Sequence, residues 1–500
     1  MSDPKSPGVY ILELSSGVKP IAGAGTSTAA FVGLVERCNP DDLNKAAFIP
    51  NWTRFVEKFG SFFPNGYLAY SVYGFFAEGG TSCYVVPLVP DDADKAFFTI
   101  KDNGTVAADS LNVTANLAGS WGNRINVTIE DASKNKDSEG KVIDAKLFKL
   151  TITYQKDVME VYDRISLFDI AAKVNGVSSL VTVEVLTALP TDPAEISAFK
   201  TRPANVSNRL DQGADGTASS VDFIGSEQNK RGLHAFDPID GINIVAIPDK
   251  PGDSNVAREG IIYCQKRKDC FFLVDPPYGT TDVKSFRSPF NSSYAALYYP
   301  WVIVTDPLTG RQKPIPPSGM VAGTYAYTDS TRGVHKAPAG IVEGYLDWAA
   351  GVETVITSTQ QEQLNPEGIN VIRSLPEGIC IWGARTLSRD SEWTYVNVRR
   401  LLTYIEKSVE AGTQWVVFEP NTPELWGNVK RNLTAFLTRV WRDGALFGSI
   451  PDEAFFVKVD EENNPSDVRD LGQLIIEVGV APVKPAEFVI IKIMQKTLSK

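Results

Sequence analysis

The sequence predicts a mixed α/β (α+β) multidomain fold, in which an α/β core is interrupted by an inserted β-rich domain and followed by a C-terminal α/β domain. Three observations support this fold class. Strand-like apolar runs alternate with helical patterns before residue 98 and again after residue 211. Between these positions, strand-like runs follow one another at short spacing, which is typical of a β-sandwich or small barrel. A strand pattern that is apolar on both faces lies near each chain end, where residues are usually polar.

The α/β core is expected to begin with a strand, two helices and a second strand, because apolar runs of strand length alternate with longer helical patterns. These elements are predicted at 29–36, 52–60, 66–80 and 83–89. The second half of the core contains a strand–helix–strand pattern of the size that a βαβ unit requires. This pattern and a further buried strand are predicted at 241–248, 255–269, 270–277 and 300–307.

The predicted insertion contains the runs LNVTANL, RINVTIED, FKLTITY and LVTVEVL, which are separated by Gly, Asn, Asp and Ser. A polar linker at 211–220 then returns the chain to α/β patterning. We therefore expect five parts: an N-terminal strand arm (1–20), a discontinuous α/β core (21–97 and 211–380), an inserted β-sandwich or barrel domain (98–200), a C-terminal domain (381–484) and a C-terminal strand arm (485–500).

The C-terminal domain is expected to contain two long helices, because apolar residues recur there at helical spacing. The helices are predicted over 392–410 and 422–442, with a strand at 415–419 between them. Two further strands, at 454–460 and 474–480, are predicted after the second helix.

The two strand arms are apolar on both faces, and such a strand needs cover on both faces. In the N-terminal arm, prolines flank the run formed by Val9, Tyr10, Ile11, Leu12 and Leu14. In the C-terminal arm, the period-2 rule separates two apolar sets. One contains Val489, Ile491 and Ile493, and the other contains Phe488, Ile490 and Met494. The sequence therefore raises the question of what pairs with each arm.

Composition excludes several classes of protein. A net charge of −11 and a pI near 5.0 argue against a nucleic-acid coat or a protein that binds anionic membranes. No run approaches the ~18 apolar residues that a membrane-spanning helix needs, and the first ten residues lack a signal-peptide pattern. We therefore expect a protein made in the cytoplasm and soluble there at first. The five scattered cysteines, with no C-x-x-C pair, are expected to be reduced and buried.

A search for catalytic or ligand-binding motifs finds none. The run GAGTST (23–28) lacks the Lys-Ser/Thr of a phosphate loop and the third glycine of a dinucleotide fingerprint, so a flexible turn is expected there. The two histidines belong to no metal-ligand pattern, and no G-x-S-x-G motif occurs. We expect no catalytic, cofactor or metal site.

The helix predicted over 422–442 carries a distinctive polar side. At 100° per residue its apolar residues gather on one side, and Arg431, Arg439 and Arg442 fall together on the other, with no acidic residue in their stripe. Such a stripe is most often a solvated face. Three arginines without an acidic neighbour also fit contact with an acidic partner, and both interpretations stay open.

Several segments resemble the contractile tail sheath family of phage tails, phage-tail-like bacteriocins and extracellular contractile injection systems. The N-terminal stretch SPGVYILELSSGVKPIAGAGTSTAAFVG resembles the start of the family's sequences. FEPNTPELW, RDGALFG, AFFVKVD and VGVAPVKPAEFVIIKI resemble its C-terminal block, and GSWGN, SSYAALYYPW, PPSGMVAGTYAYTD and RGVHKAPAG its middle. Type VI secretion sheaths are related but divide the sheath between two shorter chains, from which this single chain departs.

The resemblance implies a structural subunit that polymerises helically around an inner tube and contracts once without ATP. It implies that both arms add strands to the C-terminal sheet of neighbouring subunits, by β-augmentation. It also implies that the C-terminal domain lines the sheath, so the three arginines would face an acidic inner tube.

The partners expected are copies of the same chain, the inner tube protein, and baseplate and tail-terminator proteins, with no direct nucleic-acid contact and no membrane insertion. Assembly would occur in the cytoplasm, and the product would be part of a phage tail or of a released injection particle. Two alternatives are a baseplate or tail-terminator ring subunit and an α/β enzyme with a β-domain insert.

Overall fold

The computed structural model describes residues 20–133, 144–155, 158–282, 286–488 and 490. The chain divides into two compact units. The large unit comprises Ser27–Tyr327 and Ala339–Leu387, and the C-terminal unit comprises Met1–Thr26, Thr328–Pro338 and Ser388–Lys500.

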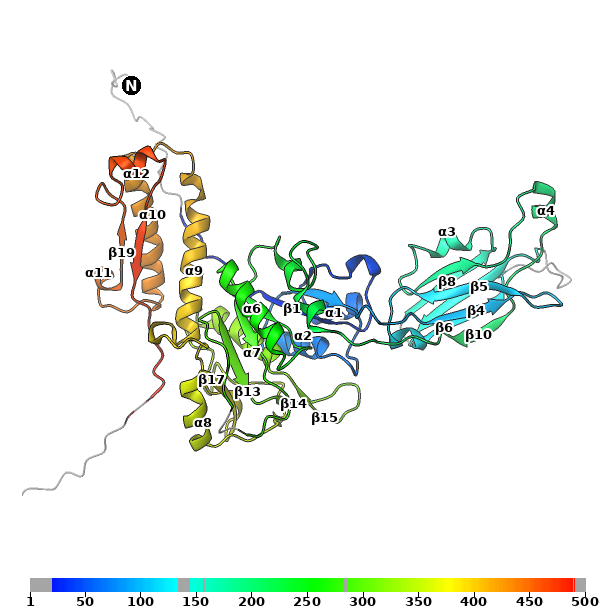
Figure 1. The fold of residues 1–500 in the computed structure, drawn as a ribbon, viewed down its shortest axis with the longest axis horizontal. Helices are drawn as coiled ribbons and strands as arrows, with labels where there is room; N and C mark the ends of the chain where they lie inside the picture. The colour runs from blue at the N-terminus through cyan, green and yellow to red at the C-terminus, as the bar shows by residue number, and fades with distance from the viewer. Residues whose placement is uncertain (1–19, 134–143, 156–157, 283–285, 489, 491–500) are drawn as a thin grey trace, which may run out of the picture. The chain divides into compact units, whose positions relative to one another are not determined.

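The large unit is built on an eight-stranded sheet (Figure 1). Six neighbouring strands are parallel, and the two edge strands β18 and β2 are antiparallel to them. In spatial order the strands are β18 (Gly378–Ile381), β17 (Ile369–Leu375), β13 (Ala295–Tyr299), β12 (Phe271–Val274), β11 (Ile244–Ala246), β1 (Ala29–Leu34), β3 (Cys83–Leu88) and β2 (Ala47–Ile49).

Helices cover both faces of this sheet, as parallel strands require. On one face Phe31 of β1 packs edge-on against Phe75 of α2, and Tyr298 of β13 exchanges a hydrogen bond with Tyr325 of α7. On the other face the neighbouring residue Val32 joins a core cluster with α6. The helices of the core are α1 (Trp52–Phe59), α2 (Leu68–Ala77), α5 (Ser220–Ile224), α6 (Ser254–Arg267), α7 (Ser318–Thr331, whose last turn belongs to the C-terminal unit) and α8 (Ser358–Leu364).

The predicted core elements are confirmed, with ends that differ by a few residues. The strand–helix–strand pattern forms β11, α6 and β12 with parallel strands, so it is a βαβ unit. The helix begins where predicted because the side chain of Asp253 accepts hydrogen bonds from the N–H groups of Asn255 and Val256. The strand predicted at 300–307 is β14 (Val302–Thr305), which pairs with β15 (Gln312–Ile315) and β16 (Gly351–Val352) in a separate small sheet.

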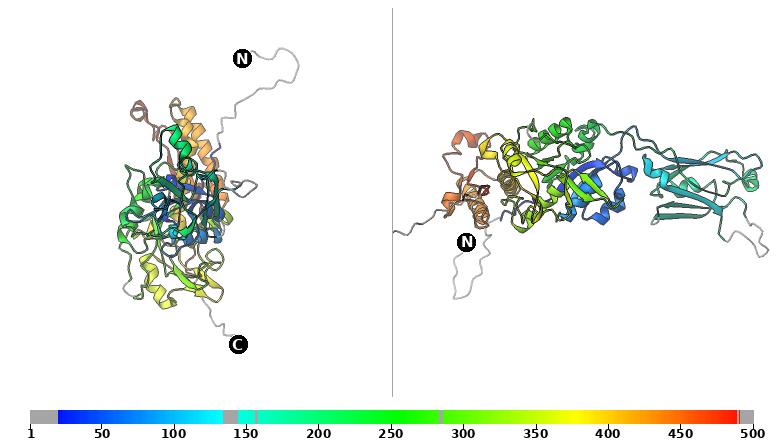
Figure 2. Two further views of the ribbon diagram at one scale, coloured as in Figure 1. Left: turned by 90° about the vertical axis from the view of Figure 1, so that its right-hand side faces the viewer. Right: turned by 90° about the horizontal axis from the view of Figure 1, so that it is seen from below.

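The interrupting β-rich segment of the large unit forms two antiparallel sheets, whose strands Figure 2 shows in two layers. Side chains alternate between buried and partly exposed along β7, with Phe148, Leu150, Ile152 and Tyr154 facing inward. One sheet contains β4 (Phe97–Lys101), β5 (Asp109–Ala115) and β9 (Val181–Val185), and the other contains β10 (Val206–Arg209), β6 (Ile125–Asp131), β7 (Phe148–Tyr154) and β8 (Val158–Ile165). Two short helices, α3 (Ile170–Val174) and α4 (Pro193–Ala198), follow β8 and β9.

The C-terminal unit has a helical core with a two-stranded sheet packed against it (Figure 1). The apolar side of α10 is buried as the sequence predicts, including Leu433 and Leu437, and it shares one core with Leu401 and Ile405 of α9. The elements are α9 (Val396–Thr413), α10 (Pro423–Arg442), α11 (Pro451–Ala454), β19 (Phe455–Lys458), α12 (Ser466–Asp470) and β20 (Glu477–Val480).

The strand predicted at 415–419 is wrong. Residues Gln414–Val416 form a short 3₁₀ helix that continues α9, and Phe418 adopts a positive φ of 70°. Trp415 and Val416 pack against the helical core, whereas Val417 and Phe418 are exposed. The apolar run is therefore used by a helix end and a turn, which periodicity over five residues does not separate from a strand.

Candidate functional site

The hairpin of β19 and β20 is the first candidate assembly surface. Phe455 and Val457 point into the helical core, whereas Phe456 points outward and is 58% exposed. Phe456 lies opposite Gly479, and its ring occupies the space that a side chain at position 479 would need. Within the described residues, β19 and β20 pair only with each other as strands. Lys458 and Glu477 share the outward face with Phe456, so the sheet offers further strands its two edges and one exposed aromatic side chain.

The two predicted strand arms fall largely outside the described residues. All five arm residues from Val9 to Leu14 do so, as do Val489, Ile491, Ile493 and Met494. Phe488 and Ile490 are described and are 72% and 81% exposed. The arm leaves from near the start of α9, where the hydroxyl of Tyr395 donates a hydrogen bond of 3.1 Å to Glu487. The predicted roles of these residues remain predictions.

The three arginines of α10 are all exposed, but their surroundings differ. Arg431 donates a hydrogen bond to the side chain of Asn428 on the same helix. Arg439 donates to the backbone carbonyl of Ile21, so its guanidinium is already used inside the C-terminal unit. At 100° per residue, Glu424 falls within about 20° of Arg431, so the expectation of a stripe without an acidic residue is wrong.

Residues 20–26 form a strap across α9 and α10, and we call this segment the arm root. Its backbone is held at three points. The carbonyl of Ile21 accepts from Arg439, the N–H of Ala24 donates to Ser408 Oγ at 2.9 Å, and the carbonyl of Thr26 accepts from Arg400 at 2.8 Å.

The side chain of Ile21 is 1% exposed and belongs to the core of the C-terminal unit. Ala24 and Thr26 of the GAGTST run are thus hydrogen-bonded to α9, at the place where the sequence predicts a flexible turn.

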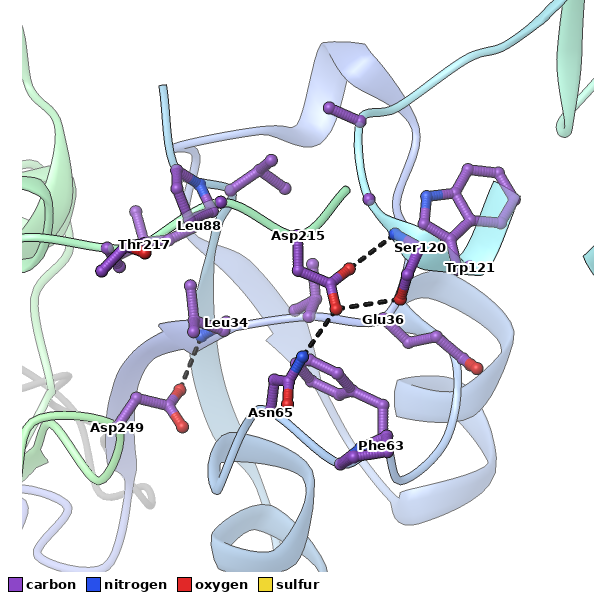
Figure 3. Close-up of a pocket in the computed structure, with 18 of the residues that line it drawn as sticks. Leu34, Glu36, Phe63, Asn65, Leu88, Ser120, Trp121, Asp215, Thr217 and Asp249 are labelled. Atoms are coloured by element: carbon purple, nitrogen blue, oxygen red, sulfur yellow. Dashed lines mark hydrogen bonds between the residues drawn. The ribbon is translucent and has the colours of Figure 1, made fainter. Parts of the chain in front are cut away.

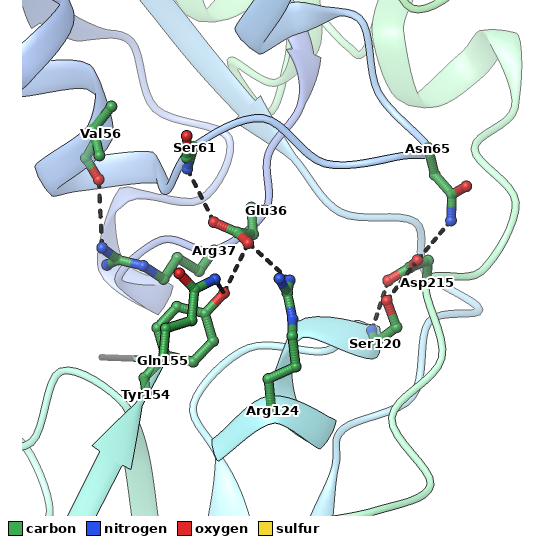
Figure 4. A network of polar contacts seen from close by, with 10 residues as sticks. All are labelled: Glu36, Arg37, Val56, Ser61, Asn65, Ser120, Arg124, Tyr154, Gln155 and Asp215. Atoms are coloured by element: carbon green, nitrogen blue, oxygen red, sulfur yellow. Dashed lines mark hydrogen bonds and ion pairs between the residues drawn. The ribbon is translucent and has the colours of Figure 1, made fainter. Parts of the chain in front are cut away.

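In the large unit, a network centred on Glu36 fastens the sandwich to the α/β core (Figure 4). The Glu36 side chain is 3% exposed. Its Oε1 accepts hydrogen bonds from Arg124 Nη2 and from the Tyr154 hydroxyl, both at 2.7 Å, and its Oε2 accepts from the Ser61 N–H at 2.9 Å. Arg124 also lies over the Tyr154 ring. Asp215 is a second point of attachment, because it accepts hydrogen bonds from Asn65 of the core and from Ser120 of the β-rich segment.

A pocket of about 260 Å³ lies at the carboxyl ends of β1 and β3 (Figure 3). Ligands of open α/β sheets commonly bind at such a position. Here, however, the polar groups are occupied by the protein itself. Asp249 accepts hydrogen bonds from the N–H groups of Leu34, Tyr67 and Leu68, and Asp215 accepts from Asn65 and Ser120.

Burial raises the pKa of Asp249 to about 6, partly offset by those N–H groups. These contacts tie the pocket walls together and make it a structural junction.

Two features are absent from the residues that the structure describes. These residues contain no group of three or more His, Cys, Asp or Glu side chains arranged to hold a metal ion. None of their helices combines the length and apolar character that crossing a bilayer demands.

Two family models match the chain, and their descriptions are those of one family. The phage tail sheath protein central domain matches residues 224–387, and the phage tail sheath C-terminal domain matches residues 388–496. Together they cover more than half of the chain.

The chain belongs to the phage tail sheath family.

Individual relatives agree with this membership. The tail sheath protein of Vibrio phage KVP40 is 26% identical over 218 residues, which are 43% of this chain and 31% of that protein. The match therefore spans about a third of that relative's length.

Among solved structures, the contracted helical sheath of the anti-feeding prophage has a TM-score of 0.59 and 24% identity over 99% of this chain and 100% of that chain. A chain of the six-fold symmetrised baseplate of the same prophage has a TM-score of 0.60 and 24% identity, with 99% and 100% covered. These likenesses establish the tail sheath fold along nearly the whole chain.

Seen as a tail sheath protein, the chain carries functional candidates that sequence reasoning missed. Ser408 and Arg400 hold the arm root, and nothing in their spacing distinguishes them from ordinary helix residues. The glycines of GAGTST were a usable signal, because glycine often marks a close approach between segments. The sequence analysis considered those glycines only as part of a phosphate loop or a dinucleotide fingerprint.

Proposed function

We propose that this protein is the structural subunit of a contractile sheath, which polymerises helically around an inner tube and contracts to drive that tube through a target envelope. The family membership supports a structural role over an enzymatic one. The single observation that carries the proposal is the incomplete β19–β20 hairpin with its outward Phe456, beside a chain end whose described residues Phe488 and Ile490 are exposed.

In this proposal each arm of one subunit adds a strand to the hairpin of a neighbour by β-augmentation. Burial of the six apolar side chains in residues 488–494 contributes about 9–18 kcal/mol, at about 1.5–3 each. Ordering the backbone of the eleven residues 486–496 costs about 11–22 kcal/mol, at about 1–2 each. The burial term arises only against a neighbour's sheet, whereas the ordering cost is the same without it, so nothing offsets the ordering of an arm that has no neighbour.

The inner tube contact is proposed for the exposed side of α10, through Arg431 and Arg442. Both are exposed, and within the described residues Arg442 has no hydrogen bond or ion pair that would occupy its guanidinium. Single exposed charge pairs contribute only about 0–1 kcal/mol, but a helical assembly repeats them on every subunit. Arg439 is set apart from this contact because it holds the arm root.

The sandwich is proposed to stand outside the lattice. Its edge strand β8 carries a register shift opposite Phe148 and Leu150, and Arg164 there has a positive φ of 55°. Bulged and charged edges of this kind prevent pairing with further strands. A domain meant to join neighbours through its edges would not be blunted in this way.

The remaining partners are proposed on family grounds: copies of this chain, an inner tube protein, and baseplate and tail-terminator proteins. Assembly is proposed to occur in the cytoplasm, with the product belonging to a phage tail or a released injection particle. The alternative is a ring subunit of the baseplate, which the similarity to a chain of the anti-feeding prophage baseplate favours.

The test is electron microscopy of the full chain produced together with the inner tube protein of the same particle. We expect long helical sheaths around tubes, and shorter, wider sheaths after mild denaturant treatment triggers contraction. Closed rings at tube ends would support the baseplate alternative. Discrete oligomers that ignore the tube would overturn both.

A further inference from the structure

The arm root is held although it forms no helix or strand. Three of its hydrogen bonds to α9 and α10 are made by backbone groups, at residues 21, 24 and 26, and these three fix the path of the chain rather than particular side chains. Two helices share the task, since Arg400 and Ser408 lie on α9 and Arg439 lies on α10. A segment that only connected two domains would not need anchors at such short intervals.

The chemistry of the two α9 contacts is specific. The Ser408 hydroxyl donates its proton to the carbonyl of Tyr404 at 2.7 Å, which leaves its oxygen free to accept the N–H of Ala24. The guanidinium of Arg400 is buried and makes paired hydrogen bonds of 2.9 and 2.6 Å to Asp329, and it still reaches the carbonyl of Thr26. Arg400 is therefore held rigidly before it meets the arm root.

Two glycines allow the arm root to lie close against α9. A Cβ at Gly412, in the last turn of α9, would lie 2.6 Å from Cγ1 of Ile21. A Cβ at Gly23 would lie 2.4 Å from the Tyr404 hydroxyl oxygen. Neither glycine has a positive φ that would demand glycine for backbone reasons. The close approach of the two segments therefore explains both glycines, one on α9 and one in the arm root.

We infer that the arm root is a dedicated anchor for the N-terminal arm. Ser408, Arg400 and Arg439 are its positioning residues. Gly412 and Gly23 leave the space that lets the arm root lie close to α9. Resting on the proposed function, this anchor sets the point from which the arm departs toward a neighbour. It also passes any pull on the arm directly into α9 and α10. Arg439 accordingly serves the arm and not the inner tube.

The first test measures hydrogen exchange of residues 20–28 in the full chain, before assembly. Ser408→Ala, Arg439→Ala and Gly412→Ala should each speed exchange of the Ala24 amide by at least about tenfold while α9 and α10 keep their protection. Arg400 is left intact, because its removal would strand the buried Asp329 carboxylate.

Matched controls come from glycines with open surroundings. At Gly427 on α10 and at Gly25 in the root, an added Cβ would meet no other atom within 4 Å. Gly427→Ala and Gly25→Ala should therefore leave exchange of residues 20–28 unchanged. Unchanged exchange in Gly412→Ala and Ser408→Ala, or equal acceleration in the controls, would overturn the anchor.

The second test counts and measures tubes by electron microscopy. Variants that release the arm root should form few or short tubes, and Gly25→Ala should form normal ones. Normal tubes from a variant whose root exchanges rapidly would overturn the assembly role of the anchor. If the unaltered chain forms no tubes, the proposed function fails, while the exchange rates still decide whether the anchor exists.

Discussion

Asp275 illustrates how single buried residues organise the large unit. It follows β12, and its carboxylate accepts hydrogen bonds from the N–H of Ser318 at 2.9 Å and from the Ser318 hydroxyl at 2.6 Å, at the start of α7. Burial raises the pKa of Asp275 to about 7, and the two hydrogen bonds from Ser318 offset part of that effect. The capping contact is therefore made by a group that prefers its neutral form.

This raised pKa gives the stability of the large unit a definite pH dependence. Because the folded pKa lies above the usual value of 3.8, the folded protein holds more protons than the unfolded chain between about pH 4 and pH 7. The contribution of Asp275 is therefore fully present below that window and is lost as pH rises through it. One pKa unit corresponds to about 1.4 kcal/mol, so a few kcal/mol are at stake.

Asp275→Asn should remove this part of the pH dependence, because the amide is neutral throughout and its oxygen can still accept the Ser318 N–H. Between pH 5 and pH 8, the unfolding free energy of the variant should fall less than that of the unaltered chain. Calorimetry or denaturant titration at the two pH values measures the difference.

Asp163→Asn provides the control, because it should leave the pH dependence between pH 5 and pH 8 unchanged. The N–H of Ser133 lowers the pKa of Asp163, so its titration lies below pH 4 and outside the measured window. Equal pH dependence of the unaltered chain and Asp275→Asn would contradict the role given to Asp275.

At the same scale, the sequence predicts that the three arginines of α10 share one side of the helix, but it does not predict that their hydrogen-bond partners differ. Helical geometry places Arg431, Arg439 and Arg442 on one side, and the structure agrees that all three are exposed. That Arg439 reaches Ile21 depends on a contact between residues 418 positions apart, which no local pattern contains. The position of Glu424 close to Arg431 on the helix, by contrast, follows from helical geometry and could have been predicted.

At the scale of the element, α10 separates two tasks on its two sides. Its apolar side builds the core with α9 and β19, and its exposed side carries Arg431 and Arg442. Changes on the exposed side should therefore alter assembly without altering folding, since surface substitutions usually change stability by about 0.5 kcal/mol or less.

The double variant Arg431→Glu and Arg442→Glu should melt within a few degrees of the unaltered chain and fail to coat inner tubes at moderate salt. Empty contracted-type sheaths can still form, because the arms are intact. Electron microscopy with purified tubes, together with thermal melting, makes the comparison.

Arg258→Glu is the matched control, since Arg258 is also exposed and bonds an asparagine three residues earlier on its helix. Normal coating by the double variant would place the tube contact on another surface.

Elements with long periodic patterns were predictable, and those that depend on partners were not. The periods of α6, α9 and α10 are long enough to specify helices. The run at 415–419 is too short for that, and only its position between two packed helices decides its structure. Likewise β10 extends the sandwich beyond the predicted end at residue 200, because Val206–Arg209 gains its strand character by pairing with β6.

At the scale of the whole molecule, the sequence predicted a tail sheath fold through resemblance and an α/β core through patterning. The five-part division of the chain stays a prediction. One of its boundaries, between residues 380 and 381, falls inside β18. The last change between the two compact units along the chain comes at Leu387 and Ser388, where the two family models also meet. A short antiparallel edge strand gives no composition shift by which sequence could place such a boundary.

The central claim is that the chain completes its C-terminal sheet only through its neighbours, and deletion of residues 485–500 tests it most directly. The deletion spares β19, β20 and the helices of the C-terminal unit, so the truncated protein should melt cooperatively as a soluble monomer. Negative-stain electron microscopy, with the full chain alongside, should show tubes from the full chain and none from the truncated one. Tubes of normal length from the truncated chain would contradict the claim.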